Sequence, residues 1–141
     1  MLGDLASLAT AIGLAIAIWQ LRQQQLLARA QFEESLVSRY WDILDRLTVE
    51  ARLGRGQAFS EDDRRAAHSY FKLADEEIYL ATKQKKIRPG TWATWQEGIS
   101  STMRREPFAG EWLRVCQDPR GQVEYADLFS FVQSEAGRGS P

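Results

Sequence analysis

An uncharged run near the N-terminus constrains this chain more than any other feature. Residues 5–21 read Leu-Ala-Ser-Leu-Ala-Thr-Ala-Ile-Gly-Leu-Ala-Ile-Ala-Ile-Trp-Gln-Leu, with Asp4 before them and Arg22 after them. As a helix that rises 1.5 Å per residue, this run is about 25 Å long. A bilayer has a hydrocarbon core of about 30 Å, and spans begin at about 17 residues. We therefore expect residues 5–21 to form a short membrane-spanning helix.

The residues that flank the run predict its placement and orientation. Trp19 stands where an interfacial aromatic anchor is expected, and the side chains of Asp4 and Arg22 can extend outward to the headgroups. The only charged groups before the run are Asp4 and the terminal amine. The arginines that follow it are Arg22, Arg29, Arg39 and Arg46. The positive-inside rule then places the C-terminal part of the chain in the cytoplasm.

A stripe of small residues repeats every four positions inside the run, at Ala9, Gly13 and Ala17. Small residues at this spacing let two helix backbones approach closely in a membrane. We expect the stripe to pack against a second copy of the chain or another membrane protein. The alternative is that Ala and Gly are simply common in spans.

A signal peptide, an interfacial helix and a buried helix are alternative interpretations of the run. A cleaved signal peptide needs Lys or Arg before the apolar stretch, and none is present. A helix lying flat at the interface needs a polar face, whereas this run is apolar all the way round. The short length leaves open a soluble helical oligomer in which residues 5–21 are buried.

Composition narrows the class of partner. The chain has 141 residues, 18 basic and 19 acidic, and beyond residue 21 the two signs balance. Proteins that bind nucleic acids usually carry a basic surplus that displaces counterions from phosphates. This chain has no such surplus, so no nucleic acid is expected as a partner. The single cysteine, Cys116, excludes an intrachain disulfide, and we expect it to be a small buried apolar residue.

The rest of the chain has helical periodicity and no strand-period segment, so the predicted class is all-α. We expect an anchor at residues 1–22, a helical cytoplasmic domain at 23–135 with a stalk at 23–31, and a disordered tail at 136–141. The domain is predicted to be a small bundle of about four to five helices. The long helix should run from the span to Arg52 and end at Gly54-Arg55-Gly56. The later helices are expected at 60–84, with Ser60 as the cap, and at 91–105, 107–116 and 122–134, with a turn at 118–121.

No pattern of catalytic or ligand-binding residues stands out. His68 is the only histidine, and no His-Glu-x-x-His or Glu-x-x-His spacing occurs, so neither a metal nor another cofactor is expected. The acidic clusters, among them 61–63 and 75–77, are interpreted as helix caps and solvated faces. Trp41, Trp92, Trp95 and Trp112 are expected in an aromatic core, with a partner-binding surface as the alternative.

Several short segments together resemble a group of small bacterial proteins with one N-terminal span and a helical cytoplasmic domain of unknown function. The segments are Ala9-Thr10-Ala11-Ile12-Gly13, Trp19-Gln20-Leu21-Arg22, Phe32-Glu33, Arg39-Tyr40, Trp92-x-x-Trp95, Pro107-Phe108 and Trp112. The resemblance covers most of the chain, but its motifs are hydrophobic and aromatic. It implies the architecture and a bacterial inner membrane, and it supplies no catalytic residue.

The functional expectation is a membrane-tethered, non-enzymatic interaction protein, which acts as a scaffold, a regulator or an accessory subunit of a membrane complex. Two alternatives stay open. One is a small ligand-binding or enzymatic helical module, in which acids, Tyr70, His68 and tryptophans meet between helices. The other is the soluble oligomer with residues 5–21 buried.

Overall fold

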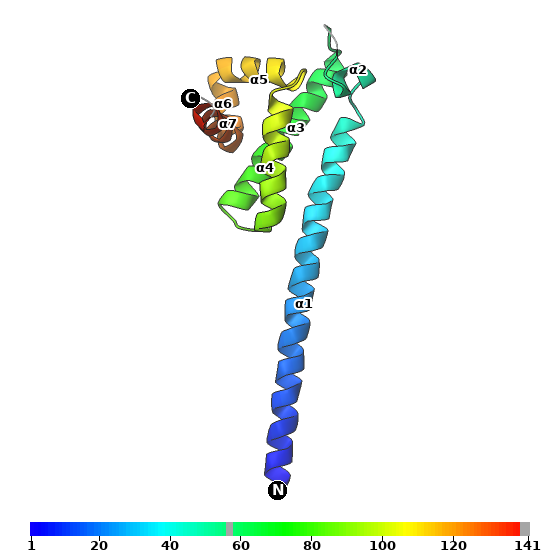
Figure 1. Cartoon of the computed structure of the whole chain (residues 1–141), viewed down its shortest axis with the longest axis vertical. Coiled ribbons are helices and arrows are strands. Elements are labelled where there is room, and N and C mark those ends of the chain that lie inside the picture. The colour runs from blue at the N-terminus through cyan, green and yellow to red at the C-terminus, as the bar shows by residue number, and fades with distance from the viewer. Residues whose placement is uncertain (56–57, 139–141) are drawn as a thin grey trace. The chain divides into compact units, whose positions relative to one another are not determined.

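The structure is a computed structural model that describes residues 1–55 and 58–138, and these residues contain helices and no strand (Figure 1). The all-α prediction is therefore confirmed, whereas the described residues form more helices than the four to five expected. The helices are α1 (Leu2–Leu44), α2 (Val49–Arg52), α3 (Glu61–Thr82), α4 (Pro89–Met103), α5 (Phe108–Gln117), α6 (Pro119–Glu124) and α7 (Ala126–Arg138).

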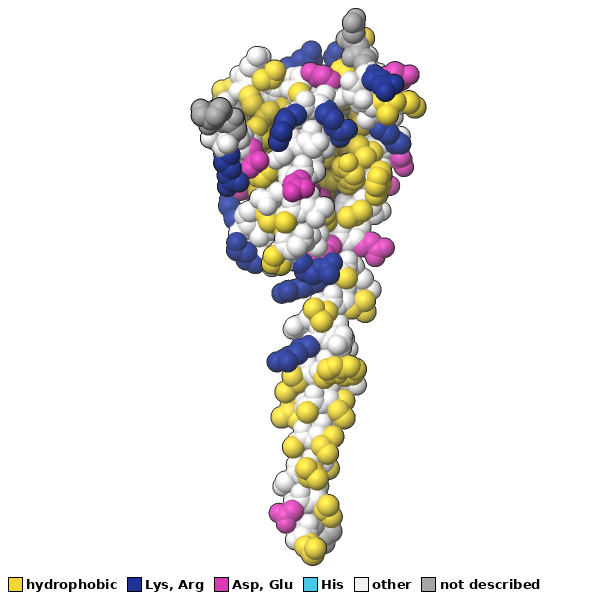
Figure 2. All heavy atoms as spheres, viewed as in Figure 1, with side chains coloured by type: hydrophobic (Ala, Val, Ile, Leu, Met, Phe, Trp, Pro, Cys, Tyr) yellow, Lys and Arg dark blue, Asp and Glu magenta, His cyan; other side chains and the backbone are white. Residues whose placement is uncertain are grey.

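The chain divides into two compact units, Met1–Glu34 and Ser35–Pro141. The first unit is the N-terminal part of α1, and the predicted anchor at 1–22 and stalk at 23–31 belong to this one uninterrupted helix. Hydrophobic side chains are numerous along its visible face, with a few charged side chains among them (Figure 2). The helix is long and apolar enough to cross a membrane, and none of its apolar window is buried inside the chain. A signal sequence, or the core helix of a soluble protein, also meets this criterion of length and composition.

The long helix ends at Leu44 rather than at the expected Arg52, because Thr48 starts a new helix. The Thr48 hydroxyl accepts a hydrogen bond from the Ala51 backbone N–H at 3.3 Å and so caps α2. The expected turn follows at Gly54, whose φ of 66° is in the left-handed region that favours glycine. Gly56, the other glycine of that predicted turn, lies outside the described residues.

The N-terminus of α3 is fixed by a reciprocal pair of hydrogen bonds. The Asp63 backbone N–H donates to the Ser60 hydroxyl at 3.0 Å, and the Ser60 backbone N–H donates to the Asp63 carboxylate at 3.0 Å. This capping box confirms the expectation that Ser60 caps the helix. The Asp63 carboxylate also accepts a hydrogen bond from the Thr48 backbone N–H at 2.9 Å, which joins the starts of α2 and α3.

The later helices differ from expectation at their ends. Helix α4 begins at Pro89 rather than Thr91, because proline suits the first helical position, whose N–H is unpaired in any case. The turn expected at 118–121 is the start of α6, where the Asp118 carboxylate accepts a hydrogen bond from the Arg120 backbone N–H at 2.9 Å. Helix α7 continues to Arg138, so 136–138 of the expected tail are helical, and 139–141 lie outside the described residues.

Aromatic side chains fill the core of the second unit between α3, α5 and the junction of α6 and α7. Phe71 of α3 contacts Trp112 of α5 and Tyr125 edge-on, with ring centroids 5.2 and 6.0 Å apart. Tyr70 contacts Phe108 in the same geometry at 5.0 Å. All five rings are buried. Burying one large apolar side chain contributes about 1.5–3 kcal/mol, so this cluster contributes substantially to the stability of the second unit.

Candidate functional site

A groove in the second unit is lined by the C-terminal part of α1, by α3 and by α4, and encloses about 260 Å³. Hydrophobic side chains gather over this part of α1 (Figure 2). The lining side chains follow helical spacing: α1 contributes Val37, Tyr40 and Trp41, α3 contributes Tyr70 and Glu77, and α4 contributes Thr94, Trp95, Gly98, Ile99 and Thr102. Positions three, four and seven apart share one face of a helix, so each helix presents one stripe to the groove.

The walls of the groove are aromatic. Tyr40 packs edge-on against both Trp41 and Tyr70, with ring centroids 5.4 and 6.1 Å apart. Trp41 is nonetheless 56% exposed, and Trp95 is half-buried. A large exposed tryptophan beside a hollow is typical of a recognition surface, since aromatic side chains are enriched where proteins bind partners and ligands.

Tyr70 of α3 and Thr102 of α4 both line the groove, and their side chains interact. Burial raises the pKa of Tyr70 well above its ordinary value, so the phenol is neutral at physiological pH. Tyr70 therefore contributes a neutral, buried phenol to the groove.

Glu77 is the charged side chain of the lining, and it is only 7% exposed. Burial is the largest influence and raises the pKa of Glu77 to about 7, while Arg39 lowers this pKa and Glu76 raises it. The Arg39 guanidinium itself pairs with the Glu76 carboxylate at 2.9 Å. Near neutral pH the Glu77 carboxyl is thus divided between its protonated and ionised forms.

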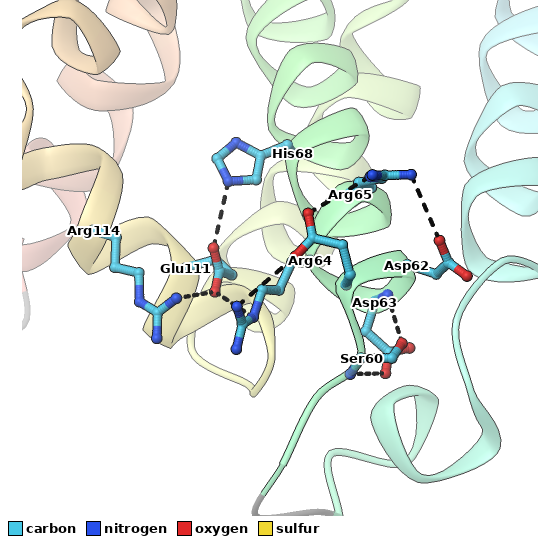
Figure 3. Close-up of polar contacts among 9 residues, drawn as sticks. Ser60, Asp62, Asp63, Arg64, Arg65, His68, Glu111 and Arg114 are labelled. Atoms are coloured by element: carbon cyan, nitrogen blue, oxygen red, sulfur yellow. Dashed lines mark hydrogen bonds and ion pairs between the residues drawn. The ribbon is translucent and has the colours of Figure 1, made fainter.

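A second polar cluster surrounds Glu111 of α5 (Figure 3). Its carboxylate oxygens lie 3.6 Å from Arg64 Nε, 3.4 Å from His68 Nε2 and 3.1 Å from Arg114 Nη1. The Glu111 side chain is 10% exposed, whereas its three partners are much more exposed. Arg64 and His68 belong to α3, so the cluster fastens α5 onto α3, and we assign it a structural role.

The four tryptophans, which were expected in an aromatic core with a partner surface as the alternative, lie in three different environments. Trp41 and Trp95 both line the groove. Trp92 packs against Phe131 of α7, with ring centroids 6.4 Å apart. Trp112 is 5% exposed and belongs to the aromatic core, as expected, so the alternative of a partner surface does not apply to it. The apolar heptad spacing that it shares with Phe108 and Val115 on α5 explains its burial.

Sequence reasoning missed Glu77. It was grouped with Asp75 and Glu76 as part of a solvated face, but Glu77 is buried in the structure. A signal was present in the sequence, since Glu77 lies two helical turns after Tyr70 and next to the apolar Ile78 on the same helix. His68, which was expected to converge with Tyr70 in the alternative ligand site, lies instead against Glu111.

The residues predicted to act in a membrane are exposed on α1. Ala9, Gly13 and Ala17 are open, and nothing lies within 4 Å of a Cβ built on Gly13. Trp19 and Arg22 are exposed as well. Helix packing through the stripe and anchoring at the interface stay predictions.

Within residues 1–55 and 58–138, no three His, Cys, Asp or Glu side chains are grouped so that they could hold a metal ion. Comparison with known proteins gives no further guide: no family model, no curated protein and no solved structure matches the chain. The similarity to bacterial single-span proteins therefore stays a prediction.

Proposed function

We propose that this protein is a single-pass membrane protein whose C-terminal helical unit acts at the membrane surface as a non-enzymatic interaction module. It would serve as a scaffold, regulator or accessory subunit of a membrane complex. The observation that carries the proposal is the exposure of residues 5–21: the apolar window of α1 has none of its residues buried inside the chain. An exposed apolar helix of this length needs a lipid or protein environment.

The orientation within this proposal rests on charge. Arginines follow the span and no Lys or Arg precedes it in this sequence, so the C-terminal unit is assigned to the cytoplasmic side. The assignment to a bacterial inner membrane rests only on the resemblance of the sequence to small bacterial proteins with one N-terminal span. The small-residue stripe at Ala9, Gly13 and Ala17 is assigned to contact with a second copy or another membrane protein. The groove at Trp41 and Trp95 is the surface of the second unit through which recognition is expected.

Membrane extraction tests the tether. We expect the full chain to remain in membranes washed with alkaline carbonate, and a chain lacking residues 1–22 to be soluble and helical. An Ile12→Arg variant places a charge in the middle of the run and should reduce insertion, because a charged residue at the centre of a span costs about 3 kcal/mol. Leu26→Arg, outside the run and also exposed, is the matched control. Removal of the full chain by carbonate would contradict the proposal.

The orientation has its own test. In a Cys116→Ser background, cysteine placed at exposed Ser134 should be protected from a membrane-impermeant maleimide in intact cells and labelled after lysis. Labelling in intact cells would place the unit on the opposite side.

A further inference from the structure

We infer that the groove between α1, α3 and α4 binds a small organic cation, an alkylated ammonium compound held among aromatic rings and paired with the Glu77 carboxylate. The residues of this site all belong to the unit Ser35–Pro141. The inference therefore does not depend on the membrane tether, and each can fail without the other.

The aromatic walls match the ligand chemistry. Tyr40, Trp41 and Trp95 line the groove together with the buried ring of Tyr70. The faces of Tyr and Trp rings attract cations within about 6 Å, with a gain of about 0.5–2 kcal/mol that grows as water is excluded. An alkylated ammonium presents both charge and apolar surface, so it suits aromatic rings better than a strongly hydrated cation does. The volume of about 260 Å³ fits a small molecule.

The charge of the lining selects the sign of the ligand. Glu77 is the one charged side chain among the residues that line the groove, and it is 7% exposed. A buried carboxylate is unfavourable unless it is paired. The Arg39 guanidinium is already engaged by Glu76 at 2.9 Å. A bound cation would supply the counterion to Glu77, whereas an anion would meet no positive side chain in the lining.

Binding should depend on pH through Glu77. The charged and titratable groups around its carboxyl are Arg39 and Tyr40 on α1 and Glu76 and Tyr70 on α3, while the lining residues of α4 are uncharged. Only the ionised carboxylate attracts a cation, and the pKa of Glu77 is about 7. The ionised fraction, and with it the affinity, should therefore rise about tenfold from pH 6 to pH 8.

The test uses the full chain in uncharged maltoside micelles and choline as the probe. Tryptophan fluorescence, followed by calorimetry, should report saturable choline binding at pH 8, because Trp41 and Trp95 lie in the site. The matched neutral probe is 3,3-dimethylbutan-1-ol, in which carbon replaces the ammonium nitrogen. We expect it to bind at least about tenfold more weakly, since it lacks the attraction to Glu77 and to the ring faces.

Variants assign the binding to this groove. Glu77→Gln and Trp41→Leu should each weaken choline binding about tenfold or more, and Glu77→Gln should remove its pH dependence. Gly98→Phe fills the groove from an exposed position where a Cβ meets nothing within 4 Å, so it should abolish binding while the helical content is kept. Trp92→Phe, outside the groove, is the control and should bind normally.

Three results would overturn the inference. One is equal affinity for choline and its neutral analogue, which would mean an apolar hollow without charge selection. Another is wild-type affinity in Glu77→Gln. The third is no saturable choline binding at pH 8 up to high millimolar concentration by a protein whose circular dichroism shows it to be folded.

Discussion

The Asp75 carboxylate in the middle of α3 accepts a hydrogen bond of 2.9 Å from the Leu128 backbone N–H in the first turn of α7. The first N–H groups of a helix have no partner within the helix, so Asp75 acts as an N-cap supplied by another helix. Leu128 itself is fully buried. The contact therefore sets the position of α7 on α3 across 53 residues of sequence.

Removing this cap should loosen α7. We expect Asp75→Ala to lower the free energy of unfolding by about 1–2 kcal/mol, the usual effect of losing a capping hydrogen bond. Asp75→Asn is the matched comparison, because its amide oxygen can still accept the Leu128 N–H. Burial raises the pKa of Asp75, so loss of its charge is not expected to destabilise the fold. Urea unfolding of both variants, followed by circular dichroism, checks this, and equal losses would contradict the capping role.

The Glu111 cluster gives a second stability prediction. Glu111→Ala should lower the free energy of unfolding by about 1–2 kcal/mol, because it leaves Arg64, His68 and Arg114 without their shared carboxylate. A larger loss is not expected, since these partners can turn to water. Arg65→Gln is the control: Arg65 is 73% exposed and 4.0 Å from Asp62, so the change should stay within about 0.5 kcal/mol. Thermal unfolding measures both variants, and equal losses of stability in Glu111→Ala and Arg65→Gln would contradict the structural role of Glu111.

Local sequence signals predicted most of the fold. Ser60 as a cap, Gly54 as a turn, and the helices around residues 60–84 and 107–116 were expected from residue chemistry within one or two turns. The short helices α2 and α6 were not predicted. Each begins at a residue with a short polar side chain and is too short to show helical apolar periodicity in the sequence. Thr48 is the N-cap of α2, and Asp118 is the N-cap of α6.

The groove was not predictable in the same way. Trp41 and Trp95 were each singled out, but they are 54 positions apart, and no local pattern brings them to one hollow. Glu77 was wrongly predicted to be exposed, because its neighbours Asp75 and Glu76 are typical of a charged, solvated helix face. Both the groove and the burial of Glu77 result from tertiary packing. This packing buries the side of α3 that carries Tyr70 and Glu77.

The buried carboxyl of Glu77 should make stability depend on pH. Its pKa is raised from 4.5 to about 7, so between these values the folded chain binds more protons than the unfolded chain. The contribution of Glu77 to the free energy of unfolding therefore falls as pH rises from about 4.5 to about 7, and remains low above that. Glu77→Gln should remove this slope and stabilise the fold at pH 8 by on the order of 3 kcal/mol. Urea unfolding from pH 5 to pH 8 measures it, and parallel curves for the two proteins would contradict the assignment.

The small-residue stripe predicts how α1 associates in a membrane. Gly13 lies between Ala9 and Ala17 on one face, and a Cβ built on it meets nothing within 4 Å inside the chain. If that face packs on a second copy, Gly13→Ile should separate the backbones and weaken the association by about 1–2 kcal/mol, roughly tenfold in the dimer constant. Ala11→Ile adds comparable bulk about 200° around the helix and is the matched control. Energy transfer between labelled chains in lipid vesicles measures the dimer fraction. Equal dimer fractions in both variants would assign the stripe no role in self-association, and a strictly monomeric wild type would leave another membrane protein as its partner.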